Sequence, residues 1–256
     1  MTPAVAVFAG LFGVLVAVIG VPYLVVKHLG AGVLRRGSAR EPTIALTFDD
    51  GPNPDTTPRV LDILARHGAR ATFFMVGEAA DAHPELVERV VAAGHEVGSH
   101  SYRHRHALFH RPPLAGFFDT RKGLRRLGRL LGHAPTFFRP PWGAYSWAVL
   151  LATWRAGAWP VHWTVESHDW HPRFAPAGVV RKVLAEAHPG GIVVMHDAGR
   201  GAANTVLALD AVLEGLAALR LRPVPLSRMS LRTGMPWSRA RARTPVARTP
   251  VERRAS

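Results

Sequence analysis

The chain has 256 residues, 48% of them hydrophobic, which is enough for one large α/β domain with appendages or for two small domains. It contains no cysteine, so disulfides, thiolate nucleophiles and cysteine-ligated zinc are excluded, and any metal must be held by His, Asp or Glu. The formal net charge is +14, but the basic residues are spread over several segments without any zinc-finger, homeodomain-like or RNP pattern, so we expect no specific nucleic-acid partner.

The N-terminal segment is continuously apolar, with no charged residue from Thr2 to Val26. At about 1.5 Å per residue, it is long enough to cross a hydrocarbon core of roughly 30 Å. No basic residue precedes it and no A-x-A-like site follows it, which favours an uncleaved transmembrane anchor at residues 1–28 over a cleavable signal peptide. Basic residues follow the span, so the positive-inside rule alone predicts a cytoplasmic domain. Long domains translocate largely regardless of charge, however, and we expect an extracytoplasmic catalytic domain with the orientation left open.

Two flanking segments bound the predicted domain, which covers residues 42–230. Residues 29–41 are rich in Gly and Arg and are expected to form a linker. Residues 231–256 are basic and of low complexity, with RTPV occurring twice, and hold too few apolar residues to pack. We expect a solvated tail there, with an arm for lipid or an anionic wall polymer as the alternative.

Between these flanks, strand-like and helix-like segments alternate along the chain. Strands are expected at 43–48, 71–76, 96–99, 137–139, 160–165, 192–195 and 222–225. Helices are expected at 58–67, 79–93, 114–131, 146–156, 177–187 and 205–219, with Asn204 as the cap of the last one. This alternation predicts a parallel β/α barrel or a doubly wound sheet.

Polar side chains follow five of the predicted strands, at the point where each strand ends. In both candidate folds the chemistry gathers at this edge of the sheet. The groups are Asp49 and Asp50, His100 and His104, Arg139, Asp169, and His196.

Two features of these groups indicate a metal. His100 and His104 are four residues apart, the spacing that puts two imidazoles on one side of a helical turn. Two His with one carboxylate leave open coordination positions, as expected of catalytic zinc. Asp49 and Asp50 are adjacent and repel each other unless their roles differ. Binding of the metal by Asp50, with Asp49 left to take a proton, resolves that conflict.

Five segments together resemble the five motifs of the polysaccharide deacetylases, the family with the NodB homology domain, also called carbohydrate esterase family four. They occur in the family's order and the resemblance covers roughly residues 42–227. It implies a distorted (β/α)7 barrel, preceded here by one N-terminal transmembrane helix. The segments are TFDDGP (47–52), HSYRH (100–104), RPPWG (139–143), SHDW (167–170) and VMHD (194–197).

The resemblance also implies roles for individual residues. Asp50, His100 and His104 would bind a divalent metal, usually Zn2+ in this family, with Co2+ as another possibility. Asp49 would be the general base, and Arg139 would be its ion-pair partner, a role that suits a planar bidentate donor.

The remaining roles concern the substrate and the leaving group. The backbone N–H of Trp142 would help to stabilise the oxyanion. His196 would be the general acid that protonates the departing amine, held and charged by Asp169. Trp170 and Val194 would line the pocket for the acetyl methyl group.

The sequence departs from the family pattern at three positions. Trp142 replaces a more usual Tyr, Glu166 stands where Asp is common, and Val194 replaces Leu. None of these changes removes a group that performs a chemical step, so an active enzyme is expected. The changes leave the substrate preference open.

We therefore predict a metal-dependent hydrolase that removes N-acetyl groups from a GlcNAc-containing polysaccharide or oligosaccharide. Its partners would be the acetylated glycan and, through the N-terminal helix, a membrane. Alternatives are an O-acetyl esterase or a deformylase acting on a lipid-linked sugar, and a non-catalytic glycan-binding protein on the same fold. A membrane-tethered nucleic-acid binder is a fourth hypothesis, for which the expected sign is salt-sensitive DNA retention through the tail.

Overall fold

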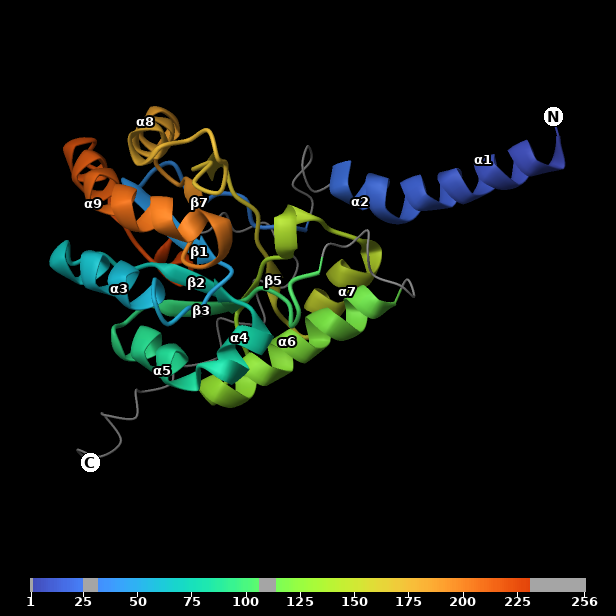
Figure 1. Cartoon of the computed structure of the whole chain (residues 1–256), viewed down its shortest axis with the longest axis horizontal. Coiled ribbons are helices and arrows are strands. Elements are labelled where there is room, and N and C mark those ends of the chain that lie inside the picture. Colours follow the sequence, from blue (N-terminus) through green and yellow to red (C-terminus); the bar gives the residue numbers. More distant parts are fainter. Residues whose placement is uncertain (1, 25–31, 106–113, 231–256) are drawn as a thin grey trace.

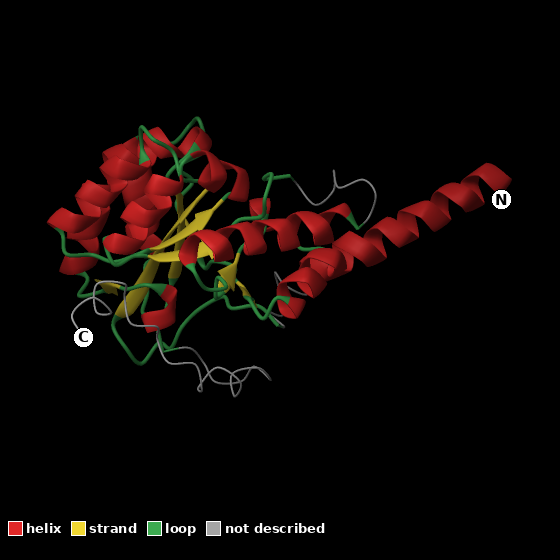
Figure 2. Cartoon of the chain, turned by 90° about the horizontal axis from the view of Figure 1, so that it is seen from below, coloured by secondary structure: helices red, strands yellow, loops and turns green. Residues whose placement is uncertain are grey.

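The computed structural model describes residues 2–24, 32–105 and 114–230 (Figure 1). Parts of three predicted segments, residues 25–28 of the anchor, 29–31 of the linker and the whole tail at 231–256, lie outside the described residues. The described chain forms one curved parallel sheet with helices packed over its outer face (Figures 1 and 2).

The strands pair in the order β5-β4-β3-β2-β1-β7-β6, and β8 pairs with β1 outside this path. Every pairing between them is parallel. Their bounds are β1 Thr43–Asp49, β2 Thr72–Met75, β3 Glu96–Ser99, β4 Phe137–Phe138, β5 Trp159–Pro160, β6 Val165–Glu166, β7 Ile192–His196 and β8 Arg222–Pro223.

The helices between the strands cover the outside of the sheet. In the domain they are α3 Thr57–Arg66, α4 Gly77–Ala82, α5 Pro84–Ala92, α6 Ala115–Leu131, α7 Trp147–Arg155, α8 Pro176–Glu186 and α9 Ala202–Ala218. The N-terminal segment consists of α1 Pro3–Leu15, a π-helical turn at Val16–Gly20 and α2 Val21–Leu24.

The central strand β1 is buried along its whole length, as expected for a parallel strand covered on both faces. Its side chains alternate between two apolar layers. Leu46 and Phe48 pack in the core beneath the helices, with Leu64 of α3 and Leu209 of α9. Ala45 points to the inner layer of the curved sheet. The same alternation places Asp49 at the inner end of this strand.

One predicted strand is wrong, because residues 160–165 do not form a single strand. The backbone N–H of Val161 donates to Phe138 of β4, whereas that of Thr164 donates to Ile192 of β7. Hydrogen bonding therefore passes from one edge of the sheet to the other within a few residues. The segment supplies both edge strands, β5 and β6, and the architecture is an α/β half-barrel of parallel strands.

The predicted helix at 79–93 is also wrong in its bounds, because it is divided into α4 and α5. The break lies at His83, which has non-helical backbone angles (φ −134°, ψ 60°) and precedes Pro84. The proline ring disfavours helical backbone in the residue before it and supplies a favourable first position for the next helix.

Residues 32–41 of the predicted linker lie against the domain. Val33 and Leu34 are buried, and Leu34 forms a parallel bridge with Val161. The backbone N–H of Gly37 donates to Gly190 at 2.8 Å. This part of the chain therefore pairs with the segment that supplies both edge strands.

The N-terminal helical segment projects away from the domain (Figures 1 and 2). Val7, Phe8 and Phe12 are more than half exposed along it. Among the described residues, the helix that is long and apolar enough to cross a membrane is Gly199–Ala218. That helix contains α9, is half buried and packs on the sheet and on α8, so it is a core helix of the domain.

Candidate active site

The predicted site residues lie at one edge of the sheet. Asp49 and His196 end β1 and β7, which are neighbours in register. His100 and Arg139 directly follow β3 and β4. Because all of these strands are parallel, their carboxyl ends meet at the same edge, and Asp169 reaches it from the loop after β6.

Asp49 and Arg139 form a buried ion pair. Nη1 of Arg139 donates to Oδ1 of Asp49 at 2.7 Å, and the same nitrogen donates to Oγ1 of Thr47 at 2.7 Å. The arginine is completely buried and the aspartate is nearly so. The contact fixes one oxygen of Asp49 and leaves the other, Oδ2, on the side of His100, at 3.9 Å from its Nε2.

The expected bidentate contact between Arg139 and Asp49 is not present. A single nitrogen makes the contact, while Nε and Nη2 have no hydrogen-bond partner among the described residues. The guanidinium instead lies over the ring of Phe74 at 4.2 Å and near that of Trp163 at 5.6 Å. Aromatic faces attract a desolvated guanidinium, which accounts for its place in the inner layer of the barrel.

Asp50, His100 and His104 converge beside this pair. Oδ1 of Asp50 lies 3.4 Å from Nε2 of His100 and 2.8 Å from Nε2 of His104. Burial alone would raise the pKa of Asp50, but the hydrogen bonds and charges of the two histidines outweigh it and hold that pKa well below its ordinary range. One carboxylate oxygen and two imidazole nitrogens, all within 4.8 Å of one another, form a donor set suited to a divalent transition metal.

His100 is oriented by a backbone carbonyl. Its Nδ1 lies 2.8 Å from the carbonyl oxygen of Arg139, which can only accept a hydrogen bond, so Nδ1 carries the proton. In a neutral ring, Nε2 then presents its lone pair toward Asp50. A lone pair facing a carboxylate is stabilised by a cation between them, so the residues present fit a bound divalent metal.

The spacing of His100 and His104 suggested a helical turn, but the two histidines do not lie on one. Residues 101–105 form a loop in which Ser101 and His104 have positive φ angles of 68° and 51°. The carboxylate of Asp119 on α6 accepts from the backbone N–H groups of Tyr102 and Arg103, and Ser101 Oγ accepts from that of His104. These polar contacts hold the loop in a conformation that the sequence pattern did not reveal.

His196 and Asp169 form a second pair at the same edge. Nδ1 of His196 lies 2.7 Å from Oδ1 of Asp169, and the histidine backbone N–H donates to Oδ2, also at 2.7 Å. Burial alone would lower the pKa of His196, but the contact with Asp169 and the charges of Asp50 and Asp49 outweigh it and raise the pKa to about 9. The imidazole is therefore cationic at neutral pH.

Asp169 is in turn held by residues of α9 that sequence reasoning missed or misassigned. Oγ1 of Thr205 donates to Oδ2 of Asp169 at 2.5 Å. Asn204 is not a helix cap, because α9 begins before it, at Ala202. The side chain of Asn204 instead donates to the backbone carbonyls of Asp169 and Phe174. Burial raises the pKa of Asp169, but the hydrogen bonds from His196 and Thr205 outweigh it and lower that pKa.

The three predicted substrate-pocket residues occupy different positions. Trp142 is 58% exposed and its ring lies 4.5 Å from that of His104. Val194 is buried in β7, two residues before His196 and so on the same face of the strand. Trp170 is partly exposed, and its Nε1 donates to Oε1 of Glu166 at 3.3 Å, which gives that substituted glutamate a contact.

Asp197 is a buried carboxylate to which the sequence assigned no role. Oγ1 of Thr57, at the start of α3, donates to its Oδ2 at 2.5 Å, and its Oδ1 has no hydrogen-bond partner in the part of the chain that the structure describes. Burial raises its pKa to about 7. A Cβ at Gly51 would overlap this carboxylate, so the absence of a side chain there lets the loop after Asp50 lie directly on Asp197.

This arrangement was compared with known proteins. Residues 36–160 match the polysaccharide deacetylase family. The chitooligosaccharide deacetylase of Sinorhizobium fredii is 39% identical over 169 residues, covering 63% of this chain and 75% of the relative. The peptidoglycan-N-acetylglucosamine deacetylase PgdA of Listeria monocytogenes is 40% identical over 174 residues, covering 68% of this chain and 35% of that longer protein.

A solved structure agrees with these sequence matches. The Bc1960 peptidoglycan N-acetylglucosamine deacetylase superimposes with a TM-score of 0.74 at 32% identity, covering 83% of this chain and 98% of that one. The predicted family is thereby confirmed, and the half-barrel of parallel strands is consistent with the predicted distorted (β/α)7 barrel. This chain belongs to the polysaccharide deacetylase family of hydrolases.

Proposed function

We propose that this hydrolase depends on a divalent metal and removes N-acetyl groups from a GlcNAc-containing glycan. The observation that carries the proposal is one cluster at the edge of the sheet. A three-residue donor set of Asp50, His100 and His104 lies beside the Asp49 carboxylate. The charges of Asp49 and Asp50 also help to raise the pKa of His196, which is cationic. A base, a metal site and an acid are the parts that amide hydrolysis needs.

Asp50, His100 and His104 would hold the metal, with Zn2+ the most suitable ion and Co2+ a substitute. When bound, such an ion lowers the pKa of a water molecule and polarises the acetyl carbonyl. The carbonyl of Arg139 would keep His100 in the tautomer that can ligate.

Asp49 would take the proton from the attacking water. Its Oδ1 is fixed by Arg139, and its Oδ2 lies on the metal-site side. The ion pair would keep this carboxylate oriented while it is excluded from bulk water. Because Asp49 directly precedes Asp50, the base and one metal ligand are positioned by the same strand end.

His196 would deliver the proton to the departing amine. Its Nδ1 is engaged by Asp169, so Nε2 is the atom available to the substrate. A pKa of about 9 keeps this ring protonated before the carbon–nitrogen bond breaks. The backbone N–H of Trp142 would stabilise the oxyanion, and Trp170 and Val194 would contact the acetyl methyl group.

The substrate class follows from the relatives rather than from the pocket. The matched proteins are named as deacetylases of chitooligosaccharides and of peptidoglycan N-acetylglucosamine, and both substrates carry an N-acetylated glucosamine. We propose the same unit for this chain. The apolar helical segment Pro3–Leu24, with its exposed Val and Phe side chains, would hold the enzyme in a membrane with the domain on the extracytoplasmic side.

The test measures acetate release by the full chain in detergent, after the metal has been stripped and then restored as Zn2+ or Co2+. Substrates are an N-acetylated chitooligosaccharide and peptidoglycan, with an O-acetylated xylan to detect esterase activity. Metal-dependent acetate release from the first two substrates supports the proposal. Release from the xylan alone points to an esterase. Stoichiometric zinc binding without any release points to a glycan-binding protein, and release that persists without metal contradicts the metal-dependent mechanism.

A further inference from the structure

Large apolar side chains are exposed at the catalytic edge of the domain. Helices α6 and α7 each precede a strand of the parallel sheet, so their first turns lie at the edge where the preceding strands end. Leu114 and Phe118 are 59% exposed at the start of α6, and Trp147 and Leu151 are 45% and 43% exposed on α7. Each pair is four residues apart and shares a helix face. Together these four side chains are called the apolar rim.

The apolar rim lies beside the N-terminal helical segment. Nε1 of Trp147 donates to the backbone carbonyl of Ala17, in the π-helical turn of that segment, at 3.1 Å. In both views α1 extends away from the end of the domain at which α6 begins, and α1 and α6 run in nearly the same direction (Figures 1 and 2). A bilayer crossed by the N-terminal helical segment Pro3–Leu24 would therefore meet the domain at the first turn of α6.

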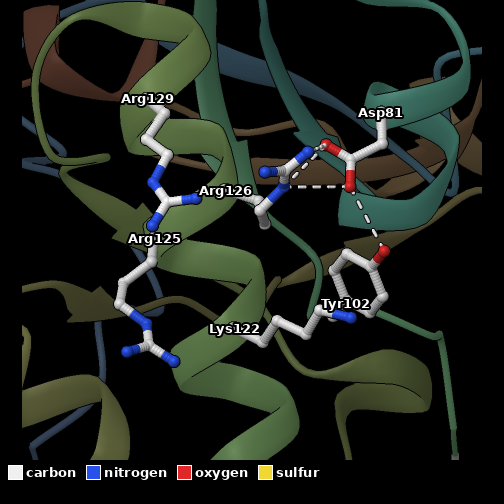
Figure 3. Close-up of a pocket in the computed structure, with 6 residues that line it drawn as sticks. All are labelled: Asp81, Tyr102, Lys122, Arg125, Arg126 and Arg129. Atoms are coloured by element: carbon white, nitrogen blue, oxygen red, sulfur yellow. Dashed lines mark hydrogen bonds and ion pairs between the residues drawn. The ribbon is translucent and has the colours of Figure 1, made fainter.

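Basic side chains begin on α6 directly after the rim. Arg121, Lys122, Arg125, Arg126 and Arg129 fall on the side of the helix opposite its buried residues. Figure 3 shows four of them along a hollow between α6 and α4, where Arg126 pairs with Asp81 and Lys122 lies over the ring of Tyr102 at 3.5 Å. A second hollow beside it is lined by Arg121, Arg125, Arg129, His133 and Arg155, with Phe117 and Leu124.

The order of side chains along α6 matches the profile of a membrane interface. Phe118 comes first, Arg121 and Lys122 follow after one turn, and Arg125 and Arg129 follow at the next turns. The first cations therefore lie about 5 Å from Phe118 along the helix axis. Tryptophan favours the headgroup boundary, Phe and Leu insert at the boundary between headgroups and acyl chains, and Lys and Arg favour the adjacent layer of anionic phosphates.

We propose that the apolar rim docks on the anionic surface of the bilayer in which the N-terminal segment is anchored. Phe118, Trp147 and Leu151 enter the interfacial layer, and the α6 cations contact lipid phosphates. This inference rests on the proposed membrane anchor and deepens the proposed function. Because Trp142 and His104 lie at the same edge, the active site then faces glycan chains close to the membrane rather than distant ones.

The chain has no cysteine, so a single reporter can be placed without altering the background. Full-length Phe118→Cys and Leu151→Cys are labelled with a nitrobenzoxadiazole fluorophore and reconstituted into vesicles of phosphatidylcholine, or of equal parts phosphatidylcholine and phosphatidylglycerol. The matched control is Leu219→Cys, a half-exposed leucine that follows α9 at the opposite edge of the sheet. Each labelled variant is first required to deacetylate a soluble chitooligosaccharide like the wild type.

Docking predicts that the labels at 118 and 151 shift to shorter wavelength, gain about two-fold in intensity, and are quenched by nitroxides on the acyl chains. The label at 219 should not change. The effect should be larger with phosphatidylglycerol, and Arg121→Glu with Arg125→Glu should remove that difference. Labels at 118 and 151 that behave like the one at 219 would overturn the proposal.

Two further readouts separate the possible failures. Flotation with vesicles after an alkaline carbonate wash reports on the anchor alone. A chain that fails to float overturns the anchor and the docking together, while acetate release in detergent still reports on the deacetylase. If soluble polyphosphate changes the labels and anionic vesicles do not, the α6 cations bind a polymer and membrane docking is wrong.

Discussion

Asp169 accepts two hydrogen bonds from His196, one from its backbone N–H and one from ring Nδ1, both at 2.7 Å. The pair fixes the orientation of the ring and raises the pKa of His196 to about 9, against an ordinary value of 6.5. In the proposed mechanism the protonated ring is the active form, so wild-type kcat should fall as the pH rises through about 9.

The first prediction concerns Asp169→Asn. Loss of the carboxylate should move the falling limb of the pH–kcat profile toward the ordinary histidine value and lower kcat at neutral pH by about 10²-fold or more. Acetate release measured from roughly pH 6 to pH 10 checks this. The control is Thr205→Val, which keeps the carboxylate and should shift the limb much less. An unmoved limb in Asp169→Asn would exclude His196 as the acid.

The second prediction separates the base from the metal ligands. Asp49→Asn keeps Asp50, His100 and His104, so it should retain one zinc per chain while kcat falls by about 10²-fold or more. His100→Ala removes a ligand and should lose both zinc and activity. Zinc per chain, measured by elemental analysis after dialysis, distinguishes the two variants. Equal zinc loss in both would mean that Asp49 is itself a ligand.

The third prediction concerns the buried ion pair. Arg139→Met leaves the Asp49 carboxylate buried without its cation, so the free energy of unfolding should fall by about 3–5 kcal/mol. Adding Asp49→Asn removes the unpaired charge, and the double variant should be more stable than Arg139→Met alone. Urea denaturation of both proteins tests this. A double variant that is no more stable than Arg139→Met would show that the unpaired charge of Asp49 is not what destabilises the single variant.

The fourth prediction uses the buried Asp197 in metal-stripped protein. Its pKa is raised from an ordinary 3.8 to about 7, so the stability that its protonated form contributes is fully present below about pH 3.8 and is lost as the pH rises through 7. Asp197→Asn cannot ionise. The stability of the variant relative to the wild type should therefore increase as the pH rises from roughly 4 to 8, by at most a few kcal/mol of unfolding free energy. Urea denaturation across that range checks the slope, and a difference that is independent of pH would contradict the assignment.

The sequence was sufficient to locate the catalytic edge, because the polar motifs follow strands that are strongly apolar and short. Thr43–Asp49 and Ile192–His196 are buried parallel strands whose last residues are predicted to carry the chemistry, and this pattern is visible in the sequence alone. The predicted family followed from the motifs at these positions. The roles of individual residues stay predictions until the variants above are measured.

Contacts between distant segments account for what the sequence did not reveal. The loop from His100 to His104 takes its shape from Asp119, which is remote in the chain and has no motif to mark it. Asn204 has the side chain of a helix cap but serves the loop after Asp169. In each case a local propensity was overridden by a hydrogen-bond partner that only the fold supplies.

The segment that supplies both edge strands has a consequence for the solution behaviour of the protein. β5 and β6 are only two residues long each, and both belong to residues 159–166 of the same chain. A second molecule would therefore find almost no row of unpaired backbone N–H and C=O groups on which to add a strand. The short edge strands thus also protect the parallel sheet from edge-to-edge aggregation.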